Sequence, residues 1–139
     1  MAIEHKDIAA IREDYTKDSL SEEFMNENPF SQFGVWFKQA LIAEVVEPNA
    51  MVLSTVAEDG YPSSRVVLMK DIKEQGISFF TNYESQKSID IRNNPKVSIL
   101  FFWPELQRQV RIEANAEMLS SDESTEYFQS RPKGSQVGA

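Results

Sequence analysis

The chain has 139 residues, of which 14 are basic and 22 acidic, and its formal net charge is −8. One domain with one hydrophobic core is expected at this length, and the composition, 41% hydrophobic and 26% charged, is typical of a globular protein. The acidic balance disfavours non-specific nucleic-acid binding, and no apolar stretch is long enough to span a membrane. The absence of cysteine excludes disulfides and thiolate metal sites.

The leading segment differs from the rest of the chain in its charge. Residues 1–30 hold eight acidic and three basic side chains, and we interpret them as an acidic N-terminal arm. The first ten residues, "MAIEHKDIAA", lack the apolar core of a signal peptide, which predicts a cytoplasmic location. Residues 31–139 are then expected to form the main domain.

A helix is expected directly after the arm, in "NPFSQFGVWFKQALIAEVV". Ser31 is the expected N-cap, and Pro48 bounds the segment. Apolar residues recur at helical spacing, which predicts a stripe in contact with the core rather than a cofactor site. The stripe consists of Phe33, Trp36, Phe37, Ala40, Leu41 and Val45.

The period of the sequence then changes to that of strands. "AMVLSTVA" and "SRVVLMK" flank "EDGYP", a hairpin signal, and "GISFFTN" follows as a third strand. "SQKSIDIRNN" predicts a short helix that begins near Ser85 and ends before Pro95. "KVSILFFW" and the alternating "RQVRIEANAEML" predict two more strands, and a last helix is expected over 120–132.

Short strands separated by hairpin signals predict a mainly β fold, an antiparallel barrel with flanking helices. Two of the strands, 66–69 and 97–103, are apolar on both faces. One face fills the barrel interior, so the other must meet a helix or a second subunit. We favour a homodimer, and the alternative is that the chain's own helices cover this face.

The chain has few side chains in patterns typical of catalytic or metal-binding sites. His5 is the only histidine, which leaves no catalytic triad and no histidine-based metal site, and no spacing of carboxylates singles out an acid–base pair. An enzyme built on this chain would therefore use a bound cofactor.

Cations and hydroxyls do gather at the ends of predicted elements. Arginine forks, lysine point charges, hydroxyls and helix starts are the groups that hold phosphate monoesters. Each of these residues alone is more often an ordinary surface group, and only their joint placement favours a phosphate site. They are Arg65, Lys70, Thr81, Ser85, Lys87, Arg131 and Ser135.

Five segments, in this order and spacing, resemble the pyridoxamine 5′-phosphate oxidase family: "RVVLMK", "FFTNYESQKS", "NNPKVSILFFW", "RQVRIEANAEMLS" and "YFQSRPKGSQVGA". The resemblance implies a split β-barrel that forms a homodimer with flavin mononucleotide (FMN) at the interface. It implies an oxidoreductase that converts pyridoxine or pyridoxamine 5′-phosphate to pyridoxal 5′-phosphate, with oxygen as acceptor. The partners would be this small-molecule substrate and a second copy, without nucleic acid or membrane.

The resemblance also assigns roles to residues. No catalytic or metal-binding side chain is implied. Matching positions imply substrate contacts by Arg12, Tyr15, Lys70, Tyr127, Arg131 and Ser135, of which Tyr127, Arg131 and Ser135 form a phosphate clamp. FMN contacts are implied for Arg65, Val66, Val67, Leu68, Met69, Lys70, Phe80, Thr81, Ser85, Gln86, Lys87 and Gln109.

The sequence departs from the family in three ways. Gln86 stands where the family often has arginine, which removes one cation from the flavin phosphate site, and Phe80 replaces a frequent tyrosine. Family members also continue past the position that matches Ala139, so the resemblance covers the family without its C-terminal part. The alternative function is that of a flavin- or B6-phosphate-binding protein of the same fold without oxidase turnover.

Overall fold

The computed structural model describes residues 2–11, 25–73, 76–82 and 84–119. They fall into two compact units, and each is treated separately. The first contains the described residues of Met1–Val45 together with Trp103–Arg108, and the second contains those from Val46 to Phe102 and from Gln109 onward. The expected boundary between an acidic arm and the main domain, at residue 30, stays a prediction.

The first unit contains α1, His5–Ala9, and α2, Pro29–Ile42. The cap of α2 is Asn28, whose side chain accepts hydrogen bonds from the backbone N–H groups of Phe30 and Ser31. The expectation that Ser31 caps this helix is therefore wrong. Proline suits the first helical position because it has no N–H to satisfy there, so Pro29 moves the start of the helix upstream.

Aromatic side chains form the core of the first unit. The rings of Phe33, Phe37 and Trp103 lie with their centroids 6.0 to 6.2 Å apart. The guanidinium of Arg108 lies 4.6 Å from the centre of the Trp36 ring and donates to Gln39 Oε1. The predicted stripe of α2 is thus a packing surface, although Leu41, at its edge, is exposed.

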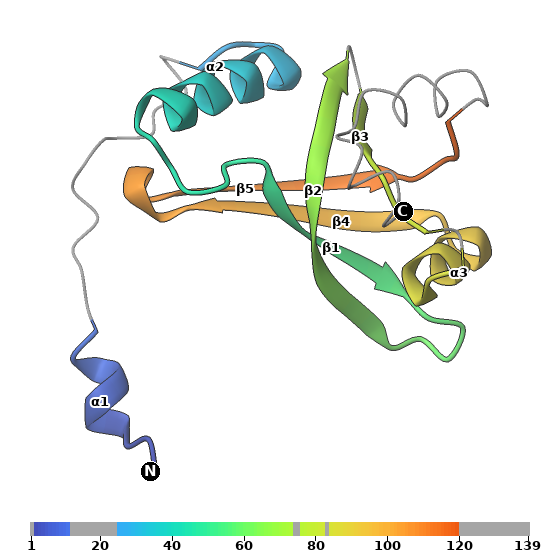
Figure 1. Cartoon of the computed structure of the whole chain (residues 1–139), viewed down its shortest axis with the longest axis horizontal. Coiled ribbons are helices and arrows are strands. Elements are labelled where there is room, and N and C mark those ends of the chain that lie inside the picture. The colour runs from blue at the N-terminus through green and yellow to red at the C-terminus, as the bar shows by residue number, and fades with distance from the viewer. Residues whose placement is uncertain (1, 12–24, 74–75, 83, 120–139) are drawn as a thin grey trace, which may run out of the picture. The chain divides into compact units, whose positions relative to one another are not determined.

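The second unit is a curled sheet of five antiparallel strands in the order β3-β2-β1-β4-β5. Figure 1 shows β1 and β2 as a long twisted hairpin. The five antiparallel strands form a half-barrel, so the expected mainly β fold is confirmed. The bounds are β1 Ala50–Val56, β2 Pro62–Lys73, β3 Gly76–Phe79, β4 Lys96–Trp103 and β5 Arg108–Asn115.

The hairpin between β1 and β2 turns where the sequence predicts it. Gly60 has a φ of 90°, a conformation that favours glycine, and its N–H donates to the carbonyl of Ala57. Across the hairpin Val56 pairs with Pro62 and Leu53 pairs with Arg65. This register decides which side chains of β2 share a face with which side chains of β1.

One face of the sheet is the core. Met51, Leu53 and Thr55 of β1 are buried, and so are Met69 of β2 and alternate residues of β4. The residues of β4 are Val97, Ile99 and Phe101. No helix in the described part of the chain is long and apolar enough to cross a membrane.

The opposite face of the sheet also carries apolar side chains, as expected, and among the described residues some of them are exposed. Val66 is 66% exposed and Phe102 is 60% exposed. Val52 pairs with Val66 on one side and with Leu100 on the other, so these three side chains form a row across β2, β1 and β4. We call this row, together with Leu68 and Phe102, the outer apolar face.

Candidate functional site

The site is built around the start of α3, Gln86–Asn93. Ser85 is the N-cap, as predicted, and its hydroxyl accepts from the backbone N–H of Ser88. Hydroxyls continue on both sides: Thr81 Oγ1 lies 3.4 Å and Ser88 Oγ 3.1 Å from Ser85 Oγ. The hydroxyls of Thr81 and Ser85 therefore lie beside the first N–H groups of a helix, an arrangement suited to an anion.

Two more predicted residues belong to this helix start. Gln86 and Lys87 are its first two residues, and Lys87 is half-buried. The side chain of Lys87 makes no hydrogen bond or ion pair with another described residue. An ammonium group at this position can balance the negative charge of a ligand.

Replacing the N-cap residue Ser85 should destabilise the start of α3. In Ser85→Ala the helix start loses its side-chain acceptor, which typically costs about 1 kcal/mol of unfolding free energy. Urea unfolding followed by circular dichroism measures it. Ser31→Ala is the matched control, because Ser31 is a first-turn residue whose side chain does not cap α2; equal losses in both variants would contradict the capping role of Ser85.

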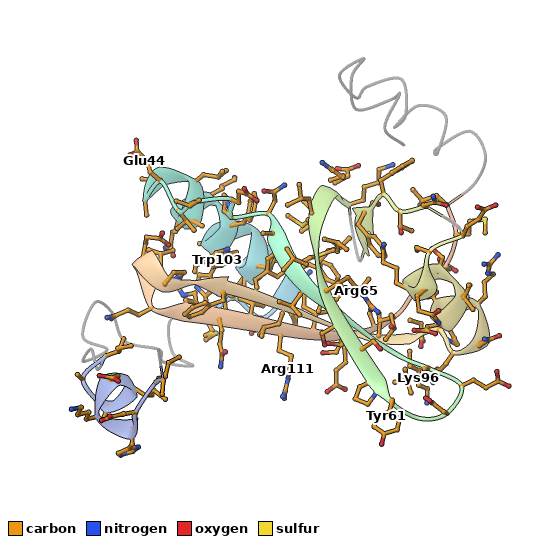
Figure 2. All side chains as sticks on the ribbon, turned by 60° about the horizontal axis from the view of Figure 1, so that its bottom comes forward. Glu44, Tyr61, Arg65, Lys96, Trp103 and Arg111 are labelled. Atoms are coloured by element: carbon orange, nitrogen blue, oxygen red, sulfur yellow. The ribbon has the colours of Figure 1, made fainter. Side chains whose placement is uncertain are left out.

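Arg65 lies on β2 and is labelled in Figure 2. Its Nη1 donates to the carbonyls of Leu53 and Ser63, each at 3.2 Å, and to the hydroxyl of Thr55 at 2.8 Å. All its hydrogen bonds to described residues use Nη1. No described residue accepts from Nη2 or Nε, and the N–H groups on these two atoms form the fork that matches the oxygens of a phosphate.

A buried carboxylate joins Arg65 to the helix. Thr55 donates to Asp90 Oδ2 at 3.3 Å, and Gln86 Nε2 donates to Asp90 Oδ1 at 2.8 Å. One chain of hydrogen bonds thus links β2, β1 and α3, and it brings the predicted residues Arg65 and Gln86 together. Neither Thr55 nor Asp90 is among the residues predicted from the sequence. A hydroxyl at a buried position of an apolar strand is the signal that could have indicated Thr55.

The rest of the Arg65–Lys70 segment divides between the two faces of the sheet. Met69 is buried; its N–H donates to the carbonyl of Asn49, and its carbonyl accepts from Asn49 Nδ2. Val66 and Leu68 point to the outer apolar face, and Val67 is half-buried. Their contacts with a cofactor stay a prediction.

Lys70 stands at an irregularity of the sheet. Met69 pairs with Phe79 and Asp71 with Ser78, so Lys70 is an extra residue, as in a β-bulge. Bulges change the direction of a side chain, and they often accompany functional sites. Lys70 is exposed, and its side chain makes no hydrogen bond or ion pair with a described residue.

The structure does not bring Gln109 next to the other predicted residues. Gln109 is exposed on β5, and two strands, β1 and β4, separate β5 from β2 in the sheet order. Phe80 is half-buried and follows β3, at the opposite edge. Five further predicted residues lie outside the described residues: Arg12, Tyr15, Tyr127, Arg131 and Ser135.

The described residues contain no group of three or more histidine, cysteine or acidic side chains that could hold a metal ion. What the described site does contain is cationic and hydroxylic: Arg65, Lys87, Thr81, Ser85 and the start of α3. The fold is that of a split-barrel protein, and these groups give it a helix start whose chemistry suits an anion.

The comparisons with known proteins identify the family. The pyridoxamine 5′-phosphate oxidase family matches residues 37–139, and the chain belongs to it. The pyridoxine/pyridoxamine 5′-phosphate oxidases of Burkholderia thailandensis and Burkholderia mallei are each 52% identical to this chain over 132 residues. The match covers 95% of the chain and 62% of either relative, so the chain spans less than two thirds of the curated relatives' length.

Solved structures support the same fold. PhzG from Burkholderia lata, in complex with tetrahydrophenazine-1-carboxylic acid, is 29% identical with a TM-score of 0.79 over 83% of this chain and 58% of its own. A pyridoxamine 5′-phosphate oxidase-related, FMN-binding protein from Nostoc punctiforme has a TM-score of 0.65 at 19% identity, over 82% of this chain and 63% of its own. The expected split β-barrel and the resemblance to the family are confirmed.

Proposed function

We propose that this chain binds FMN and holds the phosphate of the cofactor at the start of α3. The observation that carries the proposal is the connection of Arg65, on β2, with Gln86, on α3, through Thr55 and Asp90. Arg65 and Lys87 supply two positive charges, and Thr81 and Ser85 supply hydroxyls. These donors fit a phosphate monoester, and the naming of a related structure as FMN-binding is consistent with it.

We further propose that the protein is an oxidoreductase acting on pyridoxine or pyridoxamine 5′-phosphate to give pyridoxal 5′-phosphate, with oxygen as acceptor. The names of the 52% identical relatives support this substrate. Bound flavin would supply the acceptor for the hydride that leaves the substrate. The chain's own part is then to bind and orient: Lys70 and the predicted clamp of Tyr127, Arg131 and Ser135 hold the substrate phosphate, with Arg12 and Tyr15 as further contacts.

The proposed assembly is a homodimer with FMN at the interface. Val66, Leu68 and Phe102 of the outer apolar face are exposed in the described part of the chain, and contiguous exposed apolar surface marks an interaction site. A second copy would also supply the Gln109 that one sheet keeps away from Arg65 and Lys70. The proposed location is the cytoplasm, which stays a prediction.

The test is the visible spectrum of the purified protein. A flavin absorption band is expected, and addition of pyridoxine 5′-phosphate without oxygen should bleach it as the flavin is reduced. Admission of oxygen should restore the band. Unphosphorylated pyridoxine is the matched control and should bleach far more slowly, because it lacks the group that the clamp binds.

Two other results would point to other functions. A flavin band that pyridoxine 5′-phosphate leaves unchanged would favour the alternative, a flavin- or B6-phosphate-binding protein without turnover. The structure of PhzG holds tetrahydrophenazine-1-carboxylic acid, so a substrate without phosphate is the second candidate. Equal bleaching by pyridoxine and its phosphate would favour a substrate of that kind and would contradict the proposed clamp.

A further inference from the structure

The inference begins with the burial of Asp90. Its side chain is 2% exposed, and no cation among the described residues is hydrogen-bonded to it. Its two partners are neutral groups, the Thr55 hydroxyl and the Gln86 amide. Because an isolated buried carboxylate is strongly unfavourable, a positive charge linked to it by hydrogen bonds should be electrostatically coupled to it. Arg65 is linked to Asp90 in this way, because the Thr55 hydroxyl bonds to both.

The direction of these hydrogen bonds is fixed by chemistry. The guanidinium of Arg65 can only donate, so the oxygen of Thr55 must accept from Nη1. An ionised carboxylate can only accept, so the single hydrogen of Thr55 goes to Asp90. Thr55 is fully buried, so its hydroxyl is shielded from any ligand outside the sheet. The Thr55 hydroxyl therefore accepts from Arg65 and donates to Asp90 at the same time.

We propose that Thr55 and Asp90 are positioning residues for Arg65. They hold Nη1 against the sheet, so that Nη2 and Nε face the phosphate of the cofactor. The proposal rests on the proposed function, in which Arg65 binds this phosphate. Asp90 orients Gln86 of α3 by the same means, since one amide N–H of Gln86 is bound to the carboxylate. The two predicted cofactor residues are therefore held by one buried acid.

The Thr55 contact is the most specific of the three that fix Arg65. The other two acceptors are backbone carbonyls at 3.2 Å, and no side-chain substitution removes them. The hydroxyl of Thr55 is closer, at 2.8 Å, and it alone connects Arg65 to a negative charge. Thr55→Val removes the hydroxyl with little change of shape, and Thr55→Ser retains it.

The experiment measures binding of FMN and of riboflavin, which lacks the phosphate, to the flavin-free protein by fluorescence quenching. Thr55→Val should weaken FMN binding roughly tenfold, as expected for a hydrogen bond to a charged group, and should leave riboflavin binding unchanged. Thr55→Ser should stay within about twofold of the wild type. In the Arg65→Ala background, Thr55→Val should have no further effect on FMN, because the residue acts through Arg65.

Two results would overturn the proposal: equal weakening of FMN and riboflavin, or the same loss with Arg65 absent, since a purely structural Thr55 predicts both. If Thr55→Val does not fold, Thr55→Ala, which also removes the hydroxyl and leaves the Asp90–Gln86 contact in place, replaces it with the same expected pattern. A second arm needs no flavin: in urea unfolding, the effects of Thr55→Val and Arg65→Ala should be non-additive. If the wild type binds neither FMN nor riboflavin, the proposed function fails. Independently of flavin, additive effects of Thr55→Val and Arg65→Ala on the free energy of unfolding would overturn the positioning role.

Discussion

Arg131→Ala should raise the Michaelis constant for pyridoxine 5′-phosphate roughly ten- to a hundredfold, while the flavin content of the purified protein stays unchanged. The reason is that a hydrogen bond to a charged group contributes about 1.5–3 kcal/mol, and Arg131 is proposed to bind the substrate phosphate. Steady-state oxidation assays give the Michaelis constant, and absorbance after denaturation gives the flavin content. Arg131→Lys keeps the positive charge but loses the forked guanidinium, so its Michaelis constant should lie between those of the wild type and Arg131→Ala.

Arg65→Ala is the complementary variant, and its expected pattern is the reverse. Flavin should be lost on purification, because the guanidinium proposed to hold the cofactor phosphate is gone. Activity should return in part when excess FMN is added, with a nearly normal Michaelis constant for the substrate. If Arg131→Ala lost flavin and Arg65→Ala kept it, the two arginines would have been assigned to the wrong phosphates.

Local patterns in the sequence predicted much of the fold. The helix from Ser85 is found where its cap and Pro95 place it, and Gly60 forms the turn of the first hairpin. In β5 the alternation holds as far as Glu113, since Val110 and Ile112 are half-buried while Arg111 and Glu113 are exposed, and it ends at Ala114, which is exposed. In each case the signal lies within a few neighbouring residues, where periodicity and turn chemistry act.

What the sequence did not reveal depends on contacts between distant elements. Asp90 and Thr55 are 35 positions apart and meet only because α3 packs on β1. Nothing near Asp90 in the sequence distinguishes it from an exposed helical acid. The bulge at Lys70 was missed for a related reason, since a bulge is a property of the pairing of two strands and not of either strand alone.

The outer apolar face was predicted in part from the sequence and in part required the structure. The sequence indicated that β2 and β4 are apolar on both faces, and the structure shows which residues have no cover within the described chain. Whatever covers this face lies outside the described part of one chain. A second copy is the proposal because the two-sided apolar strands and the distant position of Gln109 have one common explanation.

Val66→Asp and Phe102→Asp should each convert the proposed dimer into monomers at micromolar concentration. Both side chains are mostly exposed in one chain, so a charge there leaves the fold intact, whereas at an interface it would be buried without a partner. An unpaired buried charge is destabilising by several kcal/mol, which corresponds to a rise of more than a hundredfold in the dissociation constant. Light scattering and sedimentation measure the mass.

The matched control is Val46→Asp, because Val46 is also apolar and 79% exposed but does not belong to the outer apolar face. This variant should remain dimeric. The monomeric variants should also bind FMN more weakly, since the Gln109 of a second copy would no longer be close to the Arg65 site. Dimers that persist in both Val66→Asp and Phe102→Asp would mean that the copies associate through another surface. A wild-type protein that is monomeric with flavin bound would contradict both the dimer and the interfacial cofactor.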